Sequence, residues 1–247
     1  MSMLLLESLT LLHCAFAAAA PTVLIIGASR GIGFELARQY ASAGWATHAT
    51  MREVAGSRLP SNITLHTLDV LDGAQVTALA ADFEGKALDL LVHSAGVNVG
   101  SLAKQRRVNA EAPFEVVAAL LPALRRGRAR RVGIVTSDLG RPSFLTRYRR
   151  KKRLSQPGCS KDNVCAYATS KQLANDKFRQ LEPAWRLEGV TAVALQPGYV
   201  ATDMNRGQPA KVSPEESARG LIAVLAKEAD ALAGHFLDYT GKRLSWV

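Results

Sequence analysis

The chain has 247 residues, of which 48% are hydrophobic and 21% are charged. This composition excludes a wholly disordered chain and suits a globular protein with a large core, and α/β proteins of this length commonly form one domain. The formal net charge is +10, but segment 141–163 holds eight basic residues and only one acidic residue. The excess charge is therefore mostly local, and any anionic macromolecular partner would concern that segment rather than the whole domain.

Residues 1–20 form an apolar segment that ends in four alanines. The segment resembles the core of a secretory signal, but no Lys or Arg precedes it and Glu7 interrupts it. As a membrane span it is only just long enough, and it carries Glu7 and His13. We interpret it as a helical extension before the first strand, or as the product of a start codon assigned too early, and favour this over secretory or organellar targeting.

The three cysteines, Cys14, Cys159 and Cys165, are odd in number and lack the spacing of metal ligands. We therefore expect neither a disulfide framework nor a metal site. Such cysteine usage is typical of a reducing compartment. Together with the N-terminal segment, it predicts a cytoplasmic protein for which neither a membrane nor a nucleic acid is the expected partner.

A glycine turn follows the first predicted strand. Residues 22–26 are β-branched and leucine residues, a run typical of a strand that is buried on both faces. Gly27, Gly31 and Gly33 come directly after it and open an amphipathic helix over 34–42. Glycines at this place let the backbone approach a pyrophosphate held at a helix N-terminus. The order of strand, glycine turn and helix predicts a dinucleotide site, with the turn residues Ser29, Arg30 and Ile32 among its contacts.

The second predicted strand, residues 45–50, ends at Arg52 without an acidic residue at its tip. An acid there would bind the ribose 2′-hydroxyl of NAD, whereas an arginine suits the 2′-phosphate of NADP. Arg30 in the glycine turn adds a second positive charge. We therefore predict NADP (NADPH) rather than NAD. The alternative is two solvated surface arginines, and Glu53 beside Arg52 supports it.

Further strands are predicted over 63–68, 88–96 and 131–136. Strands that alternate with helices imply a parallel sheet with right-handed crossovers. The predicted fold class is α/β: a single Rossmann-type, doubly wound parallel sheet of about seven strands, with helices on both faces. We expect this domain to cover residues 21–247.

Tyr167 and Lys171 are four residues apart, which places them on one face of a helix, one turn apart. A free tyrosine has a pKa of about 10, and a cation within roughly 4–6 Å favours the phenolate. The pair is therefore a candidate proton-transfer device. The alternative is a surface tyrosine beside a solvated lysine.

From Thr22 to Val247 the chain resembles the short-chain dehydrogenase/reductase family. The motifs that carry the resemblance occur in the family's order. They are the glycine turn Gly27–Gly33, an Asp-Val pair at Asp69 and Val70, the strand end at Ala95 and Gly96, a helix asparagine at Asn109, Ser-x-x-Gly at Ser137, Tyr-x-x-x-Lys at Tyr167 and Lys171, and a Pro-Gly loop with Pro197, Gly198, Val200 and Thr202.

The resemblance implies an oxidoreductase that moves a hydride between NADP and a small carbonyl or alcohol substrate. Ser137 would hydrogen-bond the carbonyl oxygen, and Tyr167 would supply the proton. Lys171 would lower the tyrosine pKa and hold the nicotinamide ribose, while Asn109 would hold a water that passes protons to Lys171. Many relatives pair as homodimers through the helices after strands four and five, and others act alone.

Two further features refine the resemblance. Residues 234–246 resemble the ending of the C-factor and sniffer-type carbonyl reductase branch, with Trp246 as a packing residue, and Ser213 carries a capping pattern for a helix. His93 and Ser94 stand where the family usually has two asparagines. This departure, with an insertion before Tyr167, keeps a non-catalytic NADP-binding regulator as the alternative function.

Ser137 and Tyr167 are separated by thirty positions, much farther than is usual in the family. The insertion, at about 141–163, contains the basic run 147–153, which we expect to be a solvated, mobile loop. It is interpreted as a tolerated insertion, with a nuclear-address-like tract, a contact with an anionic surface or a cap over the substrate pocket as alternatives. Three inserted serines lie closer to Tyr167, but only Ser137 directly follows a strand and precedes x-x-Gly; they are Ser143, Ser155 and Ser160.

Overall fold

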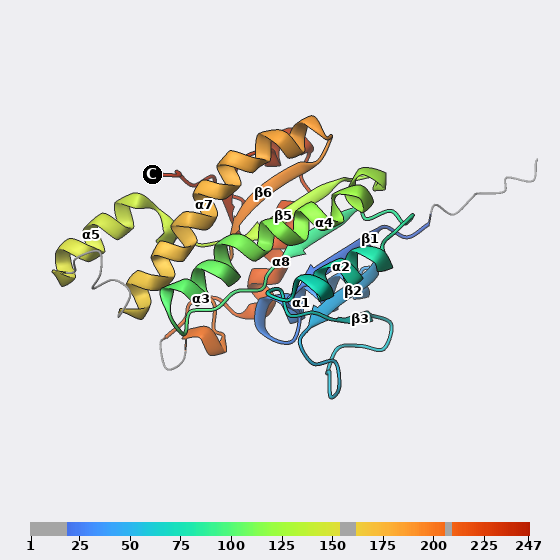
Figure 1. Ribbon diagram of the computed structural model, residues 1–247, viewed down its shortest axis with the longest axis horizontal. Helices are drawn as coiled ribbons and strands as arrows, with labels where there is room; N and C mark the ends of the chain where they lie inside the picture. The colour runs from blue at the N-terminus through green and yellow to red at the C-terminus, as the bar shows by residue number, and fades with distance from the viewer. Residues whose placement is uncertain (1–18, 154–161, 206–208) are drawn as a thin grey trace, which may run out of the picture.

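The computed structural model describes residues 19–153, 162–205 and 209–247. At its centre lies a sheet of seven strands in the order β3-β2-β1-β4-β5-β6-β7, and all neighbouring pairs are parallel (Figure 1). The strands are β1 (Thr22–Ile26), β2 (Ala46–Met51), β3 (Thr64–Thr67), β4 (Leu90–His93), β5 (Arg131–Val135), β6 (Thr191–Gln196) and β7 (Phe236–Asp238). The predicted fold class is confirmed, with strand ends shifted by one or two residues in several places.

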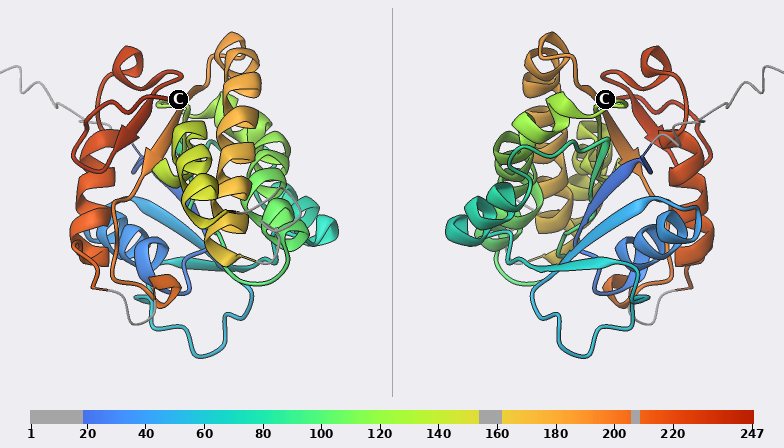
Figure 2. Two further views of the ribbon diagram at one scale, coloured as in Figure 1. Left: turned by 90° about the vertical axis from the view of Figure 1, so that its left-hand side faces the viewer. Right: turned by 90° about the vertical axis from the view of Figure 1, so that its right-hand side faces the viewer.

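Helices cover both faces of this sheet, as the two side views in Figure 2 show. Helices α2, α4 and α7 pack on one face, and α1 and α8 pack on the other. The helical elements are α1 (Gly31–Ser42), α2 (Gly73–Asp82), α3 (Leu102–Arg106), the π-helical turn η1 (Arg107–Glu111), α4 (Ala112–Arg126), the 3₁₀ turn η2 (Asp138–Gly140), α5 (Pro142–Lys152), α7 (Asn163–Leu187), the 3₁₀ turn η3 (Asp203–Asn205), α8 (Pro214–Leu225) and α9 (Ala229–Leu232).

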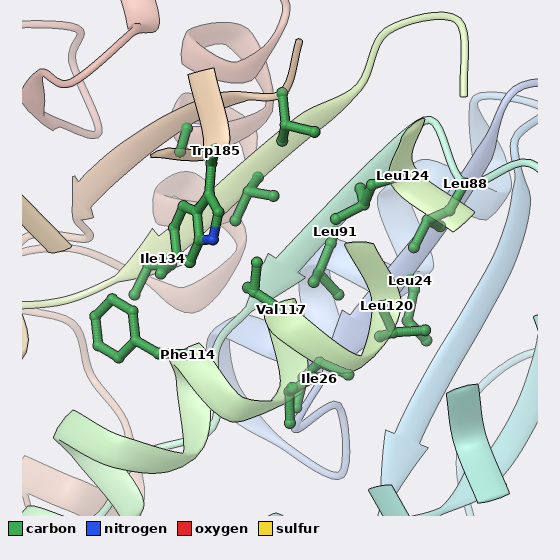
Figure 3. Packing of buried hydrophobic residues seen from close by; sticks show 14 of the residues in the cluster. Leu24, Ile26, Leu88, Leu91, Phe114, Val117, Leu120, Leu124, Ile134 and Trp185 are labelled. Carbon is green, nitrogen blue, oxygen red and sulfur yellow. The ribbon is translucent and has the colours of Figure 1, made fainter. Parts of the chain in front are cut away.

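The core consists of apolar side chains from the central strands and the helices over them. On the face of α4 and α7, Leu24, Ile26 and Leu91 of the sheet meet the apolar side of α4 (Figure 3). Each fully buried side chain of this size contributes roughly 1.5–3 kcal/mol by leaving water. Trp246 stacks on Phe178 at 5.6 Å and on Phe236 at 5.1 Å between ring centroids, so the prediction of a packing role is confirmed.

The strand order reverses at β1, which lies between β2 and β4. In parallel α/β sheets, ligands bind beside such a reversal, outside the carboxyl ends of the strands. All the predicted site residues follow the carboxyl ends of strands or lie on helices packed beside them. The topology therefore places the candidate site residues, which follow the six adjacent strands β1 to β6, near one another at the carboxyl ends of the strands.

Two expectations about the insertion and the cysteines are wrong. The basic run is not a loop, because residues 142–152 form helix α5. Leu145 is buried, and Phe144 and Tyr148 pack with it against α7, which supplies the apolar partner that a loop would lack. Cys165 is disulfide-bonded, while Cys14 and Cys159 lie outside the described residues.

Other expectations at the ends of elements have mixed outcomes. Ser213 caps α8 by accepting a hydrogen bond from the Glu216 amide at 3.0 Å, as the capping pattern predicts. Residues 1–18 and the serines Ser155 and Ser160 lie outside the described residues. Among the helices of the described ranges, none is both long and apolar enough to cross a bilayer.

Candidate active site

The glycine turn after β1 has a backbone that only glycine accommodates at two of its positions. Gly27 has a φ of +85°, and a Cβ there would lie 2.7 Å from the Ala95 Cα. A Cβ on Gly33 would overlap the carbonyl oxygen of Gly27. The turn is held by Thr50 of β2, whose side-chain and backbone oxygens accept hydrogen bonds from the amides of Gly27 and Ala28 at 3.1 and 2.8 Å.

The turn leads into α1, whose N-terminus carries no side-chain cap and no acidic residue in its first turn. By contrast, Asp72, Asp162 and Ser213 cap the N-termini of α2, α7 and α8. The first amides of a helix attract an anion when no side chain satisfies them. The glycine turn and the uncapped α1 therefore fit the pyrophosphate of a dinucleotide. Ser29 and Arg30 are exposed in this turn, and Ile32 lies within α1.

The two arginines predicted to bind the 2′-phosphate have different surroundings. Arg52 is exposed just beyond the end of β2. Arg30 forms an ion pair with Asp203 at 3.4 Å, in which both side chains are more than 60% exposed. A pair that exposed contributes little to stability, so an anionic ligand can compete for Arg30.

Asp69 and Val70 lie next to Arg52 along the edge, because the Leu68 amide bonds to the Met51 carbonyl oxygen at 2.8 Å. The Asp69 amide donates to the Gln75 side chain at 2.7 Å, and its carboxylate accepts from the Leu71 amide at 2.9 Å. Val70 packs against the core. This stretch is thus ordered beside the end of β2.

On the other side of the reversal, Lys171 and Asn109 meet the end of β4. A Cβ on Gly96 would lie 3.3 Å from Asn109 Oδ1 and 3.7 Å from Lys171 Nζ. Asn109 sits in the π-helical turn η1 and forms a two-way pair with the Val97 backbone at 2.8 Å in each direction. It also donates to Ser170 Oγ at 2.9 Å, which ties η1 to α7 one residue before Lys171.

Ser137 begins the turn η2 after β5, and its Oγ accepts a hydrogen bond from the Leu139 amide at 3.2 Å. A Cβ on Gly140 would lie 2.6 Å from the Lys171 carbonyl carbon, so only a glycine lets this turn rest on the backbone of α7. The structure therefore brings Ser137 and Tyr167 together in spite of the thirty positions between them. Ser143, by contrast, is exposed in the first turn of α5.

The electrostatics of the pair differ from the prediction. Burial raises the pKa of Tyr167 to about 12; interaction with the Ser137 hydroxyl opposes this rise and the Asp138 charge adds to it. Burial lowers the pKa of Lys171 to about 8. The expectation that Lys171 lowers the tyrosine pKa is not met by the chain's own residues. Its Nζ donates to the Val135 carbonyl at 3.1 Å and lies 5.8 Å from the Tyr167 ring centroid.

The loop after β6 crosses from this pair toward the glycine turn. Pro197 accepts a hydrogen bond from Ser217 of α8 at 2.7 Å, Gly198 has a φ of +87°, and Val200 pairs with Val212. A Cβ on Gly31 would meet the Thr202 Cγ2 at 3.2 Å. Thr202 therefore lies over the start of α1, between the residues that follow β1 to β3 and those that follow β4 to β6.

Sequence reasoning missed four buried or partly buried polar partners, which form two pairs. Gln196 donates to Asp138 Oδ1 at 2.9 Å, and Thr136 donates to Asn175 at 2.6 Å. Asn175 lies four residues after Lys171, so the same helical spacing that singled out the tyrosine would have found it. Nothing in the sequence pairs Gln196 with Asp138.

His93, where the family has asparagine, is 1% exposed, and neither ring nitrogen has a hydrogen-bond partner in the described ranges. Burial lowers the pKa of its imidazole to about 3, and the Lys171 charge contributes to this lowering, so the ring is neutral. It therefore adds no positive charge beneath Lys171.

A parallel sheet with a glycine turn at its reversal, and a tyrosine, lysine, serine and asparagine gathered beside it, defines a Rossmann-type nucleotide-binding protein. The family model for short chain dehydrogenases matches residues 21–147. The chain belongs to the short-chain dehydrogenase/reductase family of oxidoreductases, as its motifs predict.

Relatives and solved structures agree with this assignment. The chain is 30% identical to the 1-hydroxy-2-glutathionyl-2-methyl-3-butene dehydrogenase of Rhodococcus sp. (strain AD45), over 91% of this chain and 99% of that protein. It is 31% identical to the C-signal of Myxococcus xanthus over 64% of this chain and 93% of that protein. Its fold superposes on the NADPH-bound carbonyl reductase from chicken fatty liver with a TM-score of 0.79 and 26% identity, covering 92% and 99% of the two chains. The predicted branch is thus represented among its relatives.

Proposed function

We propose that the protein is an NADPH-dependent oxidoreductase that interconverts a small or medium apolar carbonyl compound and its alcohol. The observation that carries the proposal is the convergence of Ser137, Tyr167 and Lys171 at the carboxyl ends of β4 and β5, beside an uncapped helix N-terminus. The proposal is supported by the carbonyl reductase neighbour, which is described as NADPH bound.

The bound nicotinamide supplies the hydride. Ser137 hydrogen-bonds the substrate oxygen and stabilises the negative charge that develops there. Tyr167 donates the proton to that oxygen in reduction and accepts it in oxidation. Its high pKa favours the protonated phenol, which suits reduction at neutral pH. Asn109 positions Ser170 and the turn after β4, and holds the water that returns protons by way of Lys171.

The residues that hold the cofactor form groups along the carboxyl ends of the strands, and each group binds a different part of the cofactor. The amides of the glycine turn and α1 hold the pyrophosphate, and Lys171 holds the ribose on the nicotinamide side. Arg52 and Arg30 bind the 2′-phosphate, the latter after releasing Asp203, and this favours NADPH over NADH. Asp69 and Val70 contact the adenine. The remaining residues contact the nicotinamide side of the cofactor; they are Ala95, Gly96, Pro197, Gly198, Val200 and Thr202.

The test compares wild type with Tyr167→Phe. Wild type mixed with NADPH and a panel of aldehydes, ketones and quinones should consume NADPH, and the variant should lose about 10²–10⁴-fold in kcat while still binding NADPH. Matched measurements with NADH should give a lower kcat/KM. NADPH binding without turnover on the whole panel would instead favour the second candidate, a non-catalytic NADP-binding regulator, which the neutral His93 and the inserted α5 motivate.

Two further properties belong to this proposal. The cytoplasmic location predicted from the sequence stays a proposal, and the disulfide at Cys165 removes the argument from cysteine usage. A homodimer through α4 and α7 would have to accommodate α5, which packs on α7. Light scattering of the purified protein decides between one and two copies.

A further inference from the structure

Helix α5 combines an apolar side with a strongly basic C-terminal half. Its inner side, with Leu145, Phe144 and Tyr148, packs against α7. Its C-terminal half and its cap carry five exposed cations, none of which forms an ion pair with a residue of the described ranges. We call them the α5 cations: Arg147, Arg150, Lys151, Lys152 and Arg153.

The sequence around these cations offers them no compensation. No acidic residue occurs between Asp138 and Asp162. Asp138 is engaged by Gln196, and Asp162 accepts hydrogen bonds from Tyr148 and caps α7. Like charges three or four residues apart on a helix repel and destabilise it by roughly 0.2–0.5 kcal/mol per pair. The α5 cations therefore impose a repulsion that no acidic residue of this segment relieves.

The end of the helix adds to this. Arg153 caps α5 in the left-handed conformation, with a φ of +53°. Glycine is the usual residue at such a position, since a side chain there costs roughly 1 kcal/mol. Arg153 thus adds a fifth charge at a position where glycine, which is uncharged, would adopt the left-handed conformation without strain.

The α5 cations do not serve the active site. Helix α5 contacts Cys165 and Ala168, and Arg149 donates to Thr169 Oγ1 at 3.3 Å. At 100° per residue, Thr169 is about 200° around the helix from Tyr167, so α5 lies behind the catalytic face of α7. Figure 1 shows α5 at the end of the molecule, away from the sheet. A cap over the substrate pocket, one of the interpretations from sequence, does not fit this position.

We propose that α5 docks the enzyme onto a membrane surface rich in anionic phospholipid headgroups. Clusters of four to eight Lys and Arg on an amphipathic helix suit such a surface, where each nearby cation adds roughly fivefold to partitioning. The cations are concentrated in the C-terminal half of α5 and its cap, so they form a compact basic surface at this end of the molecule. Val164, two residues after the Asp162 that binds Tyr148, is 43% exposed and gives the same end of the molecule an apolar contact.

A nucleic acid fits the helix less well. The rings that would stack on bases, Phe144 and Tyr148, are stacked on each other at 5.7 Å and turned toward α7. Docking through α5 does not depend on the proposed function, since no catalytic residue takes part in it.

The test is sedimentation of the full chain with two kinds of vesicle, phosphatidylcholine alone and phosphatidylcholine with roughly 30% phosphatidylserine. Wild type should bind the second kind only, and binding should weaken as salt rises. A variant with Arg147, Arg150, Lys151 and Lys152 changed to Gln should bind at least about 100-fold more weakly. A control variant of equal net charge removes four exposed cations outside α5, Arg126, Arg179, Lys242 and Arg243, in the same way and should bind nearly as wild type does.

Three results would overturn the proposal. One is the absence of binding to phosphatidylserine vesicles at low salt. Another is an equal loss of binding in both variants, which would assign it to net charge. The third is tighter binding to a DNA duplex than to the vesicles at the same salt. NADPH binding by each variant in solution verifies that it is folded.

Discussion

The connection from β1 to α1 and the connection from β5 to α7 both place proposed site residues at the carboxyl ends of the strands, but they do so differently. In the first, the chain passes directly from strand to helix, and Gly27 and Gly33 permit contacts in which no Cβ fits. In the second, the chain forms η2, then α5, and only then reaches Tyr167. Close backbone contact within the turn positions the first group, whereas in the second group Gly140 rests on the backbone of α7 before the insertion begins.

The largest effect is expected from a change in the connection from β1 to α1. In Gly33→Ala the new Cβ overlaps the Gly27 carbonyl, so the turn must move. We expect a loss of about 3 kcal/mol in the free energy of unfolding and more than about 100-fold in NADPH affinity. Denaturant titration and fluorescence titration measure the two. The matched control is Gly73→Ala at the start of α2, where nothing lies within 4 Å of the new Cβ and stability should be unchanged or slightly higher. Equal effects of the two changes would refute the steric argument.

A change in the connection from β5 to α7 should affect turnover more than cofactor binding. Gly140→Ala pushes η2 away from the Lys171 backbone and displaces Ser137 from Tyr167. We expect kcat to fall about 100-fold, because small misplacements of reacting groups cost that much, with a much smaller change in NADPH affinity. Steady-state kinetics and cofactor titration separate the two. If NADPH affinity falls as far as kcat, η2 supports the cofactor rather than the substrate.

Stability should depend on pH through Lys171. Its pKa is about 8 in the folded protein and near 10.5 when unfolded, so between these values the unfolded chain binds more protons. Wild type should therefore gain stability relative to Lys171→Met from pH 8 to 10, by at most about 1.4 kcal/mol per pH unit. Below pH 8 the difference should be constant. Denaturation of both proteins at several pH values tests this, and parallel profiles throughout would contradict the burial of a titrating amine.

The smallest effect concerns Asp138, whose charge raises the pKa of Tyr167. Asp138→Asn retains an oxygen that can accept from Gln196 but removes the charge. The alkaline fall of kcat for reduction should move to lower pH, by less than about one unit because the Asp138 side chain is 38% exposed. Glu84→Gln, an exposed change just after the end of α2, serves as the charge control. A shift of the same size in the control would exclude a local effect.

The two connections also differ in how far the sequence predicts them. The strands, the glycine turn and the order of the site motifs can be predicted from residue types whose backbone or burial requirements are local, such as Gly27 or the apolar run of β1. The helix α5 was not predicted, because its charge density hides the spacing of Phe144, Leu145 and Tyr148, and because their partners on α7 are distant in the chain. The high pKa of Tyr167 depends on burial, which a four-residue spacing does not reveal.

The contact between Gly140 and the backbone of α7 also bears on how such a protein changes over generations. Since the chain closes onto α7 before α5 begins, the contact of Gly140 with α7 involves none of the inserted residues. A change in the inserted segment can therefore leave this contact in place. A segment that lies outside this contact can acquire a new recognition surface while the proposed site residues keep their positions.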